Sequence, residues 1–252
     1  MSFDVNASAY DSFMGRYSVL LAPQLADLAG VAPGQRALDV GAGTGALTTE
    51  LVTRLGASSV AAADPSTPFV GSMRHRFPEV DVHEAPAEAL PFPDDTFDAT
   101  IAQLVVQFMS DPIAGVTEMA RVTRPGGVVA ACVWDHGGGH GPLSPFWNAV
   151  RDLDPSAAGE AASVGVSEGD LTTVFSTAGL RDVEESALSV AVEHPTFEEW
   201  WGRYTLGVGP AGAYVAGLSD DDRAKLREHC REVFPPAPFV LTAQAWAARG
   251  LA

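Results

Sequence analysis

The sequence predicts an α/β fold built on a doubly wound, mainly parallel sheet. Strand-like apolar runs alternate with helical patterns between residues 37 and 134. A glycine-rich turn at 41–45 follows the first apolar run and leads into a helix. The second run ends at Asp64, nineteen positions beyond Gly45 (64 − 45), where such a fold brings a strand end beside the first strand. Together these features are typical of a nucleotide-binding α/β domain.

The chain of 252 residues is strongly acidic, with 15 Lys and Arg against 32 Asp and Glu and a net charge of −17. Such a surface repels phosphate groups, so we expect neither a nucleic-acid nor a membrane partner, but a neutral or cationic small-molecule substrate. The beginning of the chain has no signal-peptide pattern and no run is apolar enough to span a bilayer, so a cytoplasmic protein is expected. Cys132 and Cys230 have no partner at metal-ligand spacing, so no metal site is expected.

Residues 5–30 carry apolar side chains at helical intervals, Tyr10, Phe13 and Tyr17 among them, and Pro23 is expected to open or kink a second helical segment. Gly30 and the Pro33-Gly34 pair end this pattern. The segment precedes the first strand, so it could form a lid over a bound ligand. A helix that only covers an edge of the sheet is equally consistent with the pattern.

The glycine turn connects a strand at 37–40 to a helix that ends near Leu55. A helix N-terminus offers unpaired N–H groups, and bare glycines let a ligand lie against the main chain. The spacing Gly41-x-Gly43-x-x-Ala46 also satisfies the dinucleotide fingerprint. The turn alone therefore leaves three possibilities open: a nucleotide-like cofactor, a dinucleotide, or a tight turn with no ligand.

The second strand, 59–63, ends at Asp64, whose carboxylate could accept both hydroxyls of a ribose or could cap the next helix. A helix at 68–77 and strands at 80–83, 99–102 and 128–134 follow, with a further helix at 111–122. The loop at Ala87 and Glu88 falls at the same carboxyl edge of the sheet as the glycine turn.

The last third of the chain begins with a glycine-rich loop at 136–142, followed by helices to residue 153, at 169–178 and at 220–234, and by strands at 183–192 and 239–247. His136 and His140 in the loop are general-base candidates, although a solvated loop is the plainer interpretation. The other histidines, His194 among them, have no recognisable partner and are expected to be structural or exposed. The segment 197–217 is rich in aromatic residues, which could form a substrate cage or pack the insertion against the sheet.

Four stretches in this order resemble the class I S-adenosylmethionine-dependent methyltransferases of the ubiquinone/menaquinone-methyltransferase-like kind. They are Leu38-Asp39-Val40-Gly41-Ala42-Gly43-Thr44-Gly45, Asp64, residues 87–98 (AEALPFPDDTFD) and residues 118–127 (EMARVTRPGG). The resemblance covers about residues 36–134. It implies a Rossmann-like sheet of seven strands with the last strand antiparallel, and S-adenosyl-L-methionine as the cofactor.

The same resemblance implies the site. Gly41, Ala42 and Gly43 would lie against the methionine part of the cofactor, and Asp64 would hold its ribose. The main chain of Gln103 would face the cofactor and its side chain the substrate. Ala42 departs from the family pattern, in which many relatives carry Cys. The full cofactor-binding set is Tyr17, Asp39, Gly41, Ala42, Gly43, Asp64, Pro65, Ser66, Ala87, Glu88 and Gln103, and the substrate-binding set is Tyr10, Phe13, Gln107, Trp134, Phe146, Trp147, Trp200, Trp201 and Tyr204.

The expected organisation is a single structural domain with three parts. These are a helical lid at 1–35, a cofactor-binding core at 36–135, and the remainder of the sheet with substrate-binding insertions at 136–252. The expected function is methyl transfer to an oxygen, nitrogen or carbon atom of an aromatic or apolar small molecule, by a monomer or homodimer. A non-catalytic cofactor-binding protein and an NAD(P)-dependent oxidoreductase are the alternatives.

Overall fold

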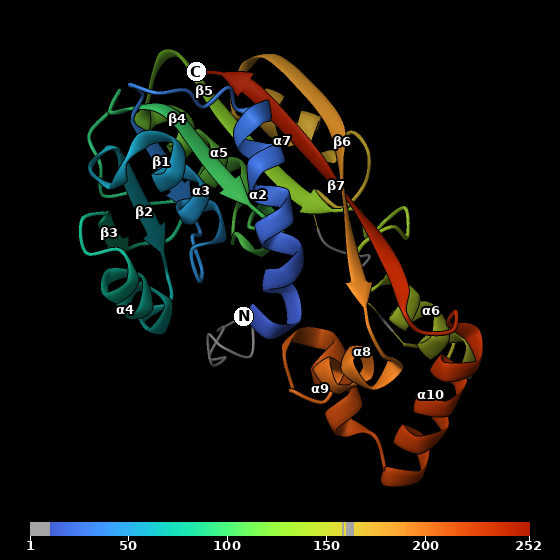
Figure 1. Cartoon of the computed structure of the whole chain (residues 1–252). Coiled ribbons are helices and arrows are strands. Elements are labelled where there is room, and N and C mark those ends of the chain that lie inside the picture. The colour runs from blue at the N-terminus through green and yellow to red at the C-terminus, as the bar shows by residue number, and fades with distance from the viewer. Residues whose placement is uncertain (1–10, 158, 160–163) are drawn as a thin grey trace.

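The structure is a computed structural model that describes residues 11–157, 159 and 164–252 (Figure 1). Its centre is one seven-stranded sheet in the order β3-β2-β1-β4-β5-β7-β6. Strands β1 to β5 pair in parallel, and β7 is antiparallel to both of its neighbours, which confirms the predicted architecture. The strands are β1 (Ala37–Val40), β2 (Val60–Asp64), β3 (Asp81–Glu84), β4 (Phe97–Gln103), β5 (Thr123–Trp134), β6 (Arg181–His194) and β7 (Phe239–Leu251).

The strand register brings the carboxyl ends of the central strands to one edge. Asp39 of β1 lies opposite Ala62 of β2 and Ile101 of β4. Strands β1 and β2 are apolar almost throughout and every residue in them is buried, as expected for parallel strands covered on both faces. The glycine turn follows β1, and Asp64 and Gln103 are the last residues of β2 and β4, so all three lie at this edge, as the sequence predicts.

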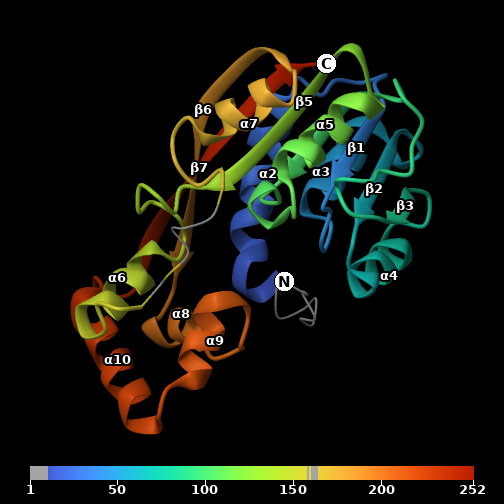
Figure 2. The ribbon, with the colours of Figure 1, turned by 180° about the vertical axis from the view of Figure 1, so that it is seen from behind.

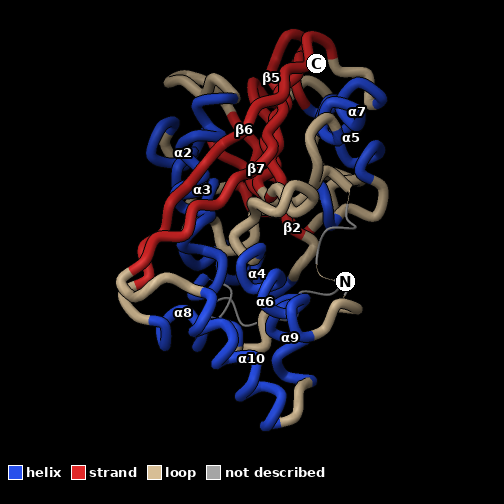
Figure 3. Tube along the Cα trace, turned by 90° about the vertical axis from the view of Figure 1, so that its right-hand side faces the viewer, coloured by secondary structure: helices blue, strands red, loops and turns tan. Residues whose placement is uncertain are grey.

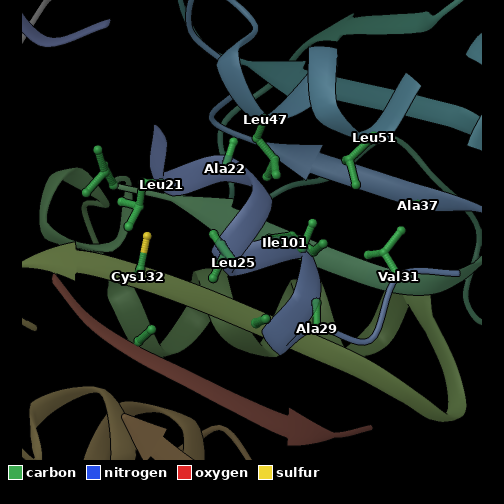
Figure 4. Packing of buried hydrophobic residues seen from close by; sticks show 14 of the residues in the cluster. Leu21, Ala22, Leu25, Ala29, Val31, Ala37, Leu47, Leu51, Ile101 and Cys132 are labelled. Carbon is green, nitrogen blue, oxygen red and sulfur yellow. The ribbon is translucent and has the colours of Figure 1, made fainter. Parts of the chain in front are cut away.

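Helices cover both faces of the sheet (Figures 1 and 2). On one face, Leu21 and Leu25 of α2 (Arg16–Leu28) pack with Leu47 and Leu51 of α3 (Ala46–Leu55) over Ile101 (Figure 4). Helix α4 (Thr67–Arg76) joins the same cluster. The other face is covered by α5 (Pro112–Val122) and α7 (Asp170–Thr177).

The N-terminal helix differs from its prediction in one respect. A short π-helical turn, Asp11–Gly15, leads into α2, which continues through Pro23 without a second start. The buried residues of α2 recur on one side, Leu21, Ala22 and Leu25 among them, so packing on the sheet compensates for the hydrogen bond that proline cannot donate. Tyr10 lies outside the described residues.

A separate group of helices beyond the end of the sheet is here called the cap. It consists of α6 (Ser144–Leu153), α8 (Phe197–Tyr204), α9 (Gly209–Gly217) and α10 (Asp220–Val233) (Figure 1). Strands β6 and β7 are longer than predicted and extend beyond the rest of the sheet to reach the cap (Figures 1 and 3). The cap has a hydrophobic cluster of its own, separate from the two clusters on the faces of the sheet. There are also two short 3-10 turns. Ala57–Ser59 precedes β2, and Val106–Phe108 follows β4.

Candidate active site

Side chains are absent from the glycine turn for two different reasons. Gly41, Gly43 and Gly45 all have positive φ, a conformation that residues with side chains rarely adopt. A Cβ on Gly41 would lie 2.4 Å from Cγ2 of Val105, and a Cβ on Gly45 would lie 2.6 Å from Sδ of Met73. The nearest atom to a Cβ on Gly43 is 4.0 Å away, the carbonyl oxygen of Gly41. Packing therefore requires Gly41 and Gly45, whereas Gly43 leaves an open space.

Gly43 is one of the residues that line a pocket at the carboxyl edge of the sheet. Its walls come from α2, the end of β1, the glycine turn, the start of α3 and the end of β4. Five of the lining residues are absent from the predicted cofactor-binding set: Ser18, Thr44, Ala46, Leu47 and Leu104. The complete lining is Ser18, Asp39, Gly41, Ala42, Gly43, Thr44, Ala46, Leu47, Gln103 and Leu104.

Asp39 is the carboxylate of this pocket. It is 1% exposed, and its Oδ2 accepts a hydrogen bond of 2.6 Å from the Thr48 hydroxyl. Burial raises the pKa of Asp39 to about 7, because the charged form loses its hydration, and the nearby Asp64 carboxylate adds to the rise. A cationic group in the pocket would stabilise the ionised form of Asp39.

Asp64 ties the glycine turn to the loop that follows β2. Its Oδ2 accepts a hydrogen bond from the Gly43 N–H and its Oδ1 accepts one from the Ser66 N–H, both at 2.8 Å. Burial raises the pKa of this carboxyl group, while the two N–H donors oppose the rise. Each carboxylate oxygen keeps a second lone pair, so Asp64 can both hold the turn and accept further hydrogen bonds.

The remaining predicted cofactor residues surround this edge without lining the pocket. Pro65 is exposed, Ser66 is half-buried and Ala87 is buried. Oε1 of Glu88 accepts hydrogen bonds from the N–H groups of Ser110 and Asp111, at 2.7 and 3.1 Å, and so fixes the start of α5. A role for these residues in ligand binding stays a prediction.

Three predicted side chains near this edge carry a buried polar atom that has no hydrogen-bond partner among the residues the structure describes. They are Oε1 of Gln103, Oε1 of Gln107 and the indole Nε1 of Trp134. Nε2 of Gln103 donates to the carbonyl oxygen of Ser18 at 3.1 Å, which fixes the orientation of its amide. Buried polar groups are rarely left unpaired, so these atoms are candidates for contact with a ligand.

Helix α2 is connected to the cap by a buried polar network. The hydroxyl of Tyr17 lies 3.2 Å from Nε2 of His194, and Nδ1 of His194 lies 3.3 Å from Oε2 of Glu199. Glu199 also pairs with Arg16 at 3.0 Å and with Arg203. Burial lowers the pKa of His194 and raises the pKa of Tyr17 to about 12. Of the two roles expected for His194, the structure shows the structural one, with partners 177 and 5 positions away that the sequence does not reveal.

Removing the Tyr17 hydroxyl tests this network. We expect Tyr17→Phe to lower the free energy of unfolding by about 1–3 kcal/mol, because the buried His194 ring loses a hydrogen bond. Urea denaturation followed by circular dichroism measures the change. The control is Tyr214→Phe, whose half-buried hydroxyl makes a longer bond of 3.4 Å to Asp154 and should change stability by less than about 0.5 kcal/mol. Equal effects of the two substitutions would contradict the network.

The two loop histidines lie at the end of β5 but do not line the pocket. His136 is half-buried, and burial lowers its pKa to about 4, which makes it a weak base at neutral pH. Nδ1 of His140 lies 2.7 Å from Oδ2 of Asp135, a 1% exposed residue that sequence reasoning passed over. Asp135 directly follows β5, and its Oδ2 also lies 3.5 Å from Nε2 of Gln244 on β7. A general-base role for His136 or His140 stays a prediction.

The aromatic residues of the cap pack mainly on one another. The rings of Phe146 and Tyr204 stack with centroids 4.2 Å apart, and Phe13 meets Tyr204 edge-on at 5.4 Å. The cap cluster buries Phe13, Phe146, Trp147, Trp200, Trp201 and Tyr204, each with at most 8% exposed. Of the two interpretations left open by the sequence, the structure shows packing, and a contact with substrate stays a prediction.

Two features are absent from the part of the chain that the structure describes. Within residues 11–157, 159 and 164–252, no group of three or more His, Cys, Asp or Glu side chains is placed to hold a metal ion. No helix in these ranges has the length and apolar character needed to cross a membrane.

Comparisons with known proteins agree with this geometry. A methyltransferase-domain family model matches residues 38–131. An uncharacterised protein of Mycobacterium tuberculosis is 35% identical over 193 residues, 72% of this chain and 69% of that protein. A demethylmenaquinone methyltransferase of Mycobacterium sp. (strain KMS) is 43% identical over 103 residues, 41% of this chain and 43% of that enzyme. A solved putative methyltransferase of Bacillus halodurans, 15% identical, shares the fold with a TM-score of 0.59 and covers 91% of this chain and 97% of its own.

Proposed function

Because the chain belongs to the class I S-adenosylmethionine-dependent methyltransferases, we propose that it methylates an oxygen, nitrogen or carbon atom of an aromatic or apolar small molecule. The observation that carries the proposal is the open space over Gly43, next to the buried carboxylate of Asp39. Membership of this family argues against the alternative function of an NAD(P)-dependent oxidoreductase.

The residues at the pocket fit the cofactor. The space over Gly43 admits a ligand directly against the main chain, and Asp39 offers a buried carboxylate to the cofactor's ammonium group. Asp64 offers free lone pairs for the ribose hydroxyls. When bound, S-adenosylmethionine supplies a methyl group on a cationic sulfur.

The protein's contribution to such a transfer is chiefly alignment. Ser18 of α2 and the glycine turn line the pocket, and Asp64 holds the turn through the Gly43 N–H, so donor and acceptor can be held in line with water excluded. Alignment supplies roughly 7–11 kcal/mol in favourable cases, whereas a general base adds about two to four powers of ten in rate. Replacing His136 or His140 is therefore expected to slow the reaction rather than abolish it.

We further propose a neutral or cationic acceptor and no nucleic-acid partner, in keeping with the net charge of −17. A cytoplasmic protein, monomeric or dimeric, is part of the same proposal. We also propose that the chain is one structural domain with three parts. These are a helical lid at 1–35, a cofactor-binding core at 36–135, and the rest of the sheet with substrate-binding insertions at 136–252.

Methyl transfer itself is tested with methyl-labelled cofactor. Incubation of the purified protein with labelled S-adenosylmethionine and a small-molecule extract of bacterial cells should give S-adenosylhomocysteine together with a labelled low-mass product. A sample without extract is the control. Cofactor binding without any turnover, over a range of extracts, would instead support the non-catalytic cofactor-binding protein.

Cofactor affinity is expected to depend on pH through Asp39. The pKa of this group is raised to about 7 in the ligand-free protein, so its carboxyl group is mostly protonated below that pH. An ammonium group favours the ionised form and lowers this pKa, so binding releases a proton and affinity falls as the pH drops below 7. The fall should approach about tenfold per pH unit.

Calorimetric titration with S-adenosylhomocysteine, at pH 5.5 to 8 and in buffers of different ionisation enthalpy, measures both the affinity and the proton release. The matched variant is Asp39→Asn, which should bind more weakly at pH 8 and lose this pH dependence. Proton release that is unchanged by the substitution would show that Asp39 is not the responsible group.

A further inference from the structure

Two side chains on the face of the sheet that α2 covers each carry an unpaired polar atom. Oε1 of Gln103 and Nε1 of Trp134 are both buried without a hydrogen-bond partner among the described residues. Gln103 is the Cα partner of Cys132 in the β4–β5 register, and Trp134 lies two residues further along β5. Residues two apart in a strand point to the same face, so Gln103 and Trp134 are diagonal neighbours.

Helix α2 contacts both side chains with consecutive residues. The Gln103 amide donates to the carbonyl oxygen of Ser18, and the Trp134 ring meets the Tyr17 ring edge-on with centroids 6.1 Å apart. Ser18 and Gln103 line the pocket. Trp134 does not line the pocket itself, but it contacts α2 one residue away from the Ser18 carbonyl that holds Gln103.

The two atoms differ in what they require. The bond from Nε2 to the Ser18 carbonyl orients the Gln103 amide, and its Oε1, a carbonyl oxygen, can only accept a hydrogen bond. The indole N–H of Trp134 can only donate one. Their ligand needs one donor and one acceptor, and neither atom carries a charge.

The charges near this position favour a neutral ligand. Asp39, the carboxylate in the pocket lining, is bonded to Thr48 and is used by the cofactor in the proposed function. A cationic acceptor would therefore lack a counter-charge, and an anionic one would face the lone pairs of the Gln103 amide oxygen. Burying an uncompensated charge is far more costly than burying a hydrogen-bonded neutral group.

Resting on the proposed function, we propose that Gln103 and Trp134 form the recognition site for a neutral methyl acceptor. This acceptor carries a hydroxyl or N–H donor for Gln103 Oε1 and an oxygen acceptor for the Trp134 indole. The inference narrows the acceptor class from neutral or cationic to neutral.

The test uses three probes that share a 4-hydroxyphenyl ring and differ in charge: 4-hydroxybenzamide, 4-hydroxybenzoate and 4-hydroxybenzylamine. Binding of each to the full-length protein saturated with S-adenosylhomocysteine is measured by ligand-observed NMR titration. The neutral amide should bind at least about tenfold more tightly than either charged probe. Equal or tighter binding of a charged probe, or no binding of the amide, would overturn the inference.

Matched indole substitutions locate the site. Trp134→Phe should weaken binding of the amide about fivefold to tenfold and leave the affinity for S-adenosylhomocysteine within about twofold. Trp246→Phe is the control, because Trp246 also has a buried Nε1 without a partner among the described residues but packs against the cluster on the opposite face. An amide affinity unchanged by Trp134→Phe contradicts the site. Failure of the wild type to bind S-adenosylhomocysteine would overturn the proposed function itself.

Discussion

Gly43→Val is expected to abolish cofactor binding while the protein still folds. A Cβ built on Gly43 would meet only the carbonyl oxygen of Gly41, 4.0 Å away, and Gly43 lines the pocket, so a valine side chain there is expected to fill volume that the cofactor requires. We expect the affinity for S-adenosylhomocysteine to fall by at least about a hundredfold, which corresponds to about 2.7 kcal/mol or more. Calorimetric titration measures the affinity, and circular dichroism checks the fold.

The control must reproduce the backbone strain of this substitution without entering the pocket. Gly30 has φ +66, close to the +55 of Gly43, and a Cβ built on it also meets nothing within 4 Å. A residue with a side chain costs roughly 1–2 kcal/mol in this conformation, so Gly30→Val should lower stability but leave the affinity unchanged. Full affinity in Gly43→Val would show that the cofactor does not lie against this part of the turn.

Asp64→Asn is expected to have the second largest effect. Both oxygens of Asp64 accept main-chain N–H groups, and the amide of asparagine would turn its own N–H donors toward one of them. The affinity for S-adenosylhomocysteine should fall about tenfold to hundredfold, and the free energy of unfolding by about 1–3 kcal/mol.

A second aspartate provides the comparison. Asp98 also accepts a main-chain hydrogen bond, 2.6 Å from the N–H of Arg36, but it lies near the start of β4, at the opposite edge of the sheet. Asp98→Asn should lower stability and spare the affinity, as judged by the same calorimetric and denaturation measurements. If both variants lose affinity in proportion to stability, Asp64 acts only on the fold.

The fold could be predicted because its signals are local. The apolar runs at 37–40 and 59–63 and the glycines between them specify strand, turn and helix over short stretches, and parallel pairing then brings Asp39, Asp64 and Gln103 to one edge. The antiparallel last strand was implied by the family resemblance, and the structure confirms it.

The site was harder to predict where it depends on contacts between distant residues. His194 and Tyr17 are 177 positions apart, so nothing in their local sequence indicates that they meet. Leu104 lines the pocket with a φ of +62. Leucine rarely adopts this conformation, so the sequence does not predict it. The aromatic segment at 197–204 fits both a cage and a hydrophobic core, and the choice depends on the cap helices around it.

The most direct test of the account is calorimetric titration of the wild-type protein with S-adenosylhomocysteine and, separately, with NAD. The account predicts saturable binding of one S-adenosylhomocysteine per chain and no binding of NAD. Binding of NAD without binding of S-adenosylhomocysteine would contradict it.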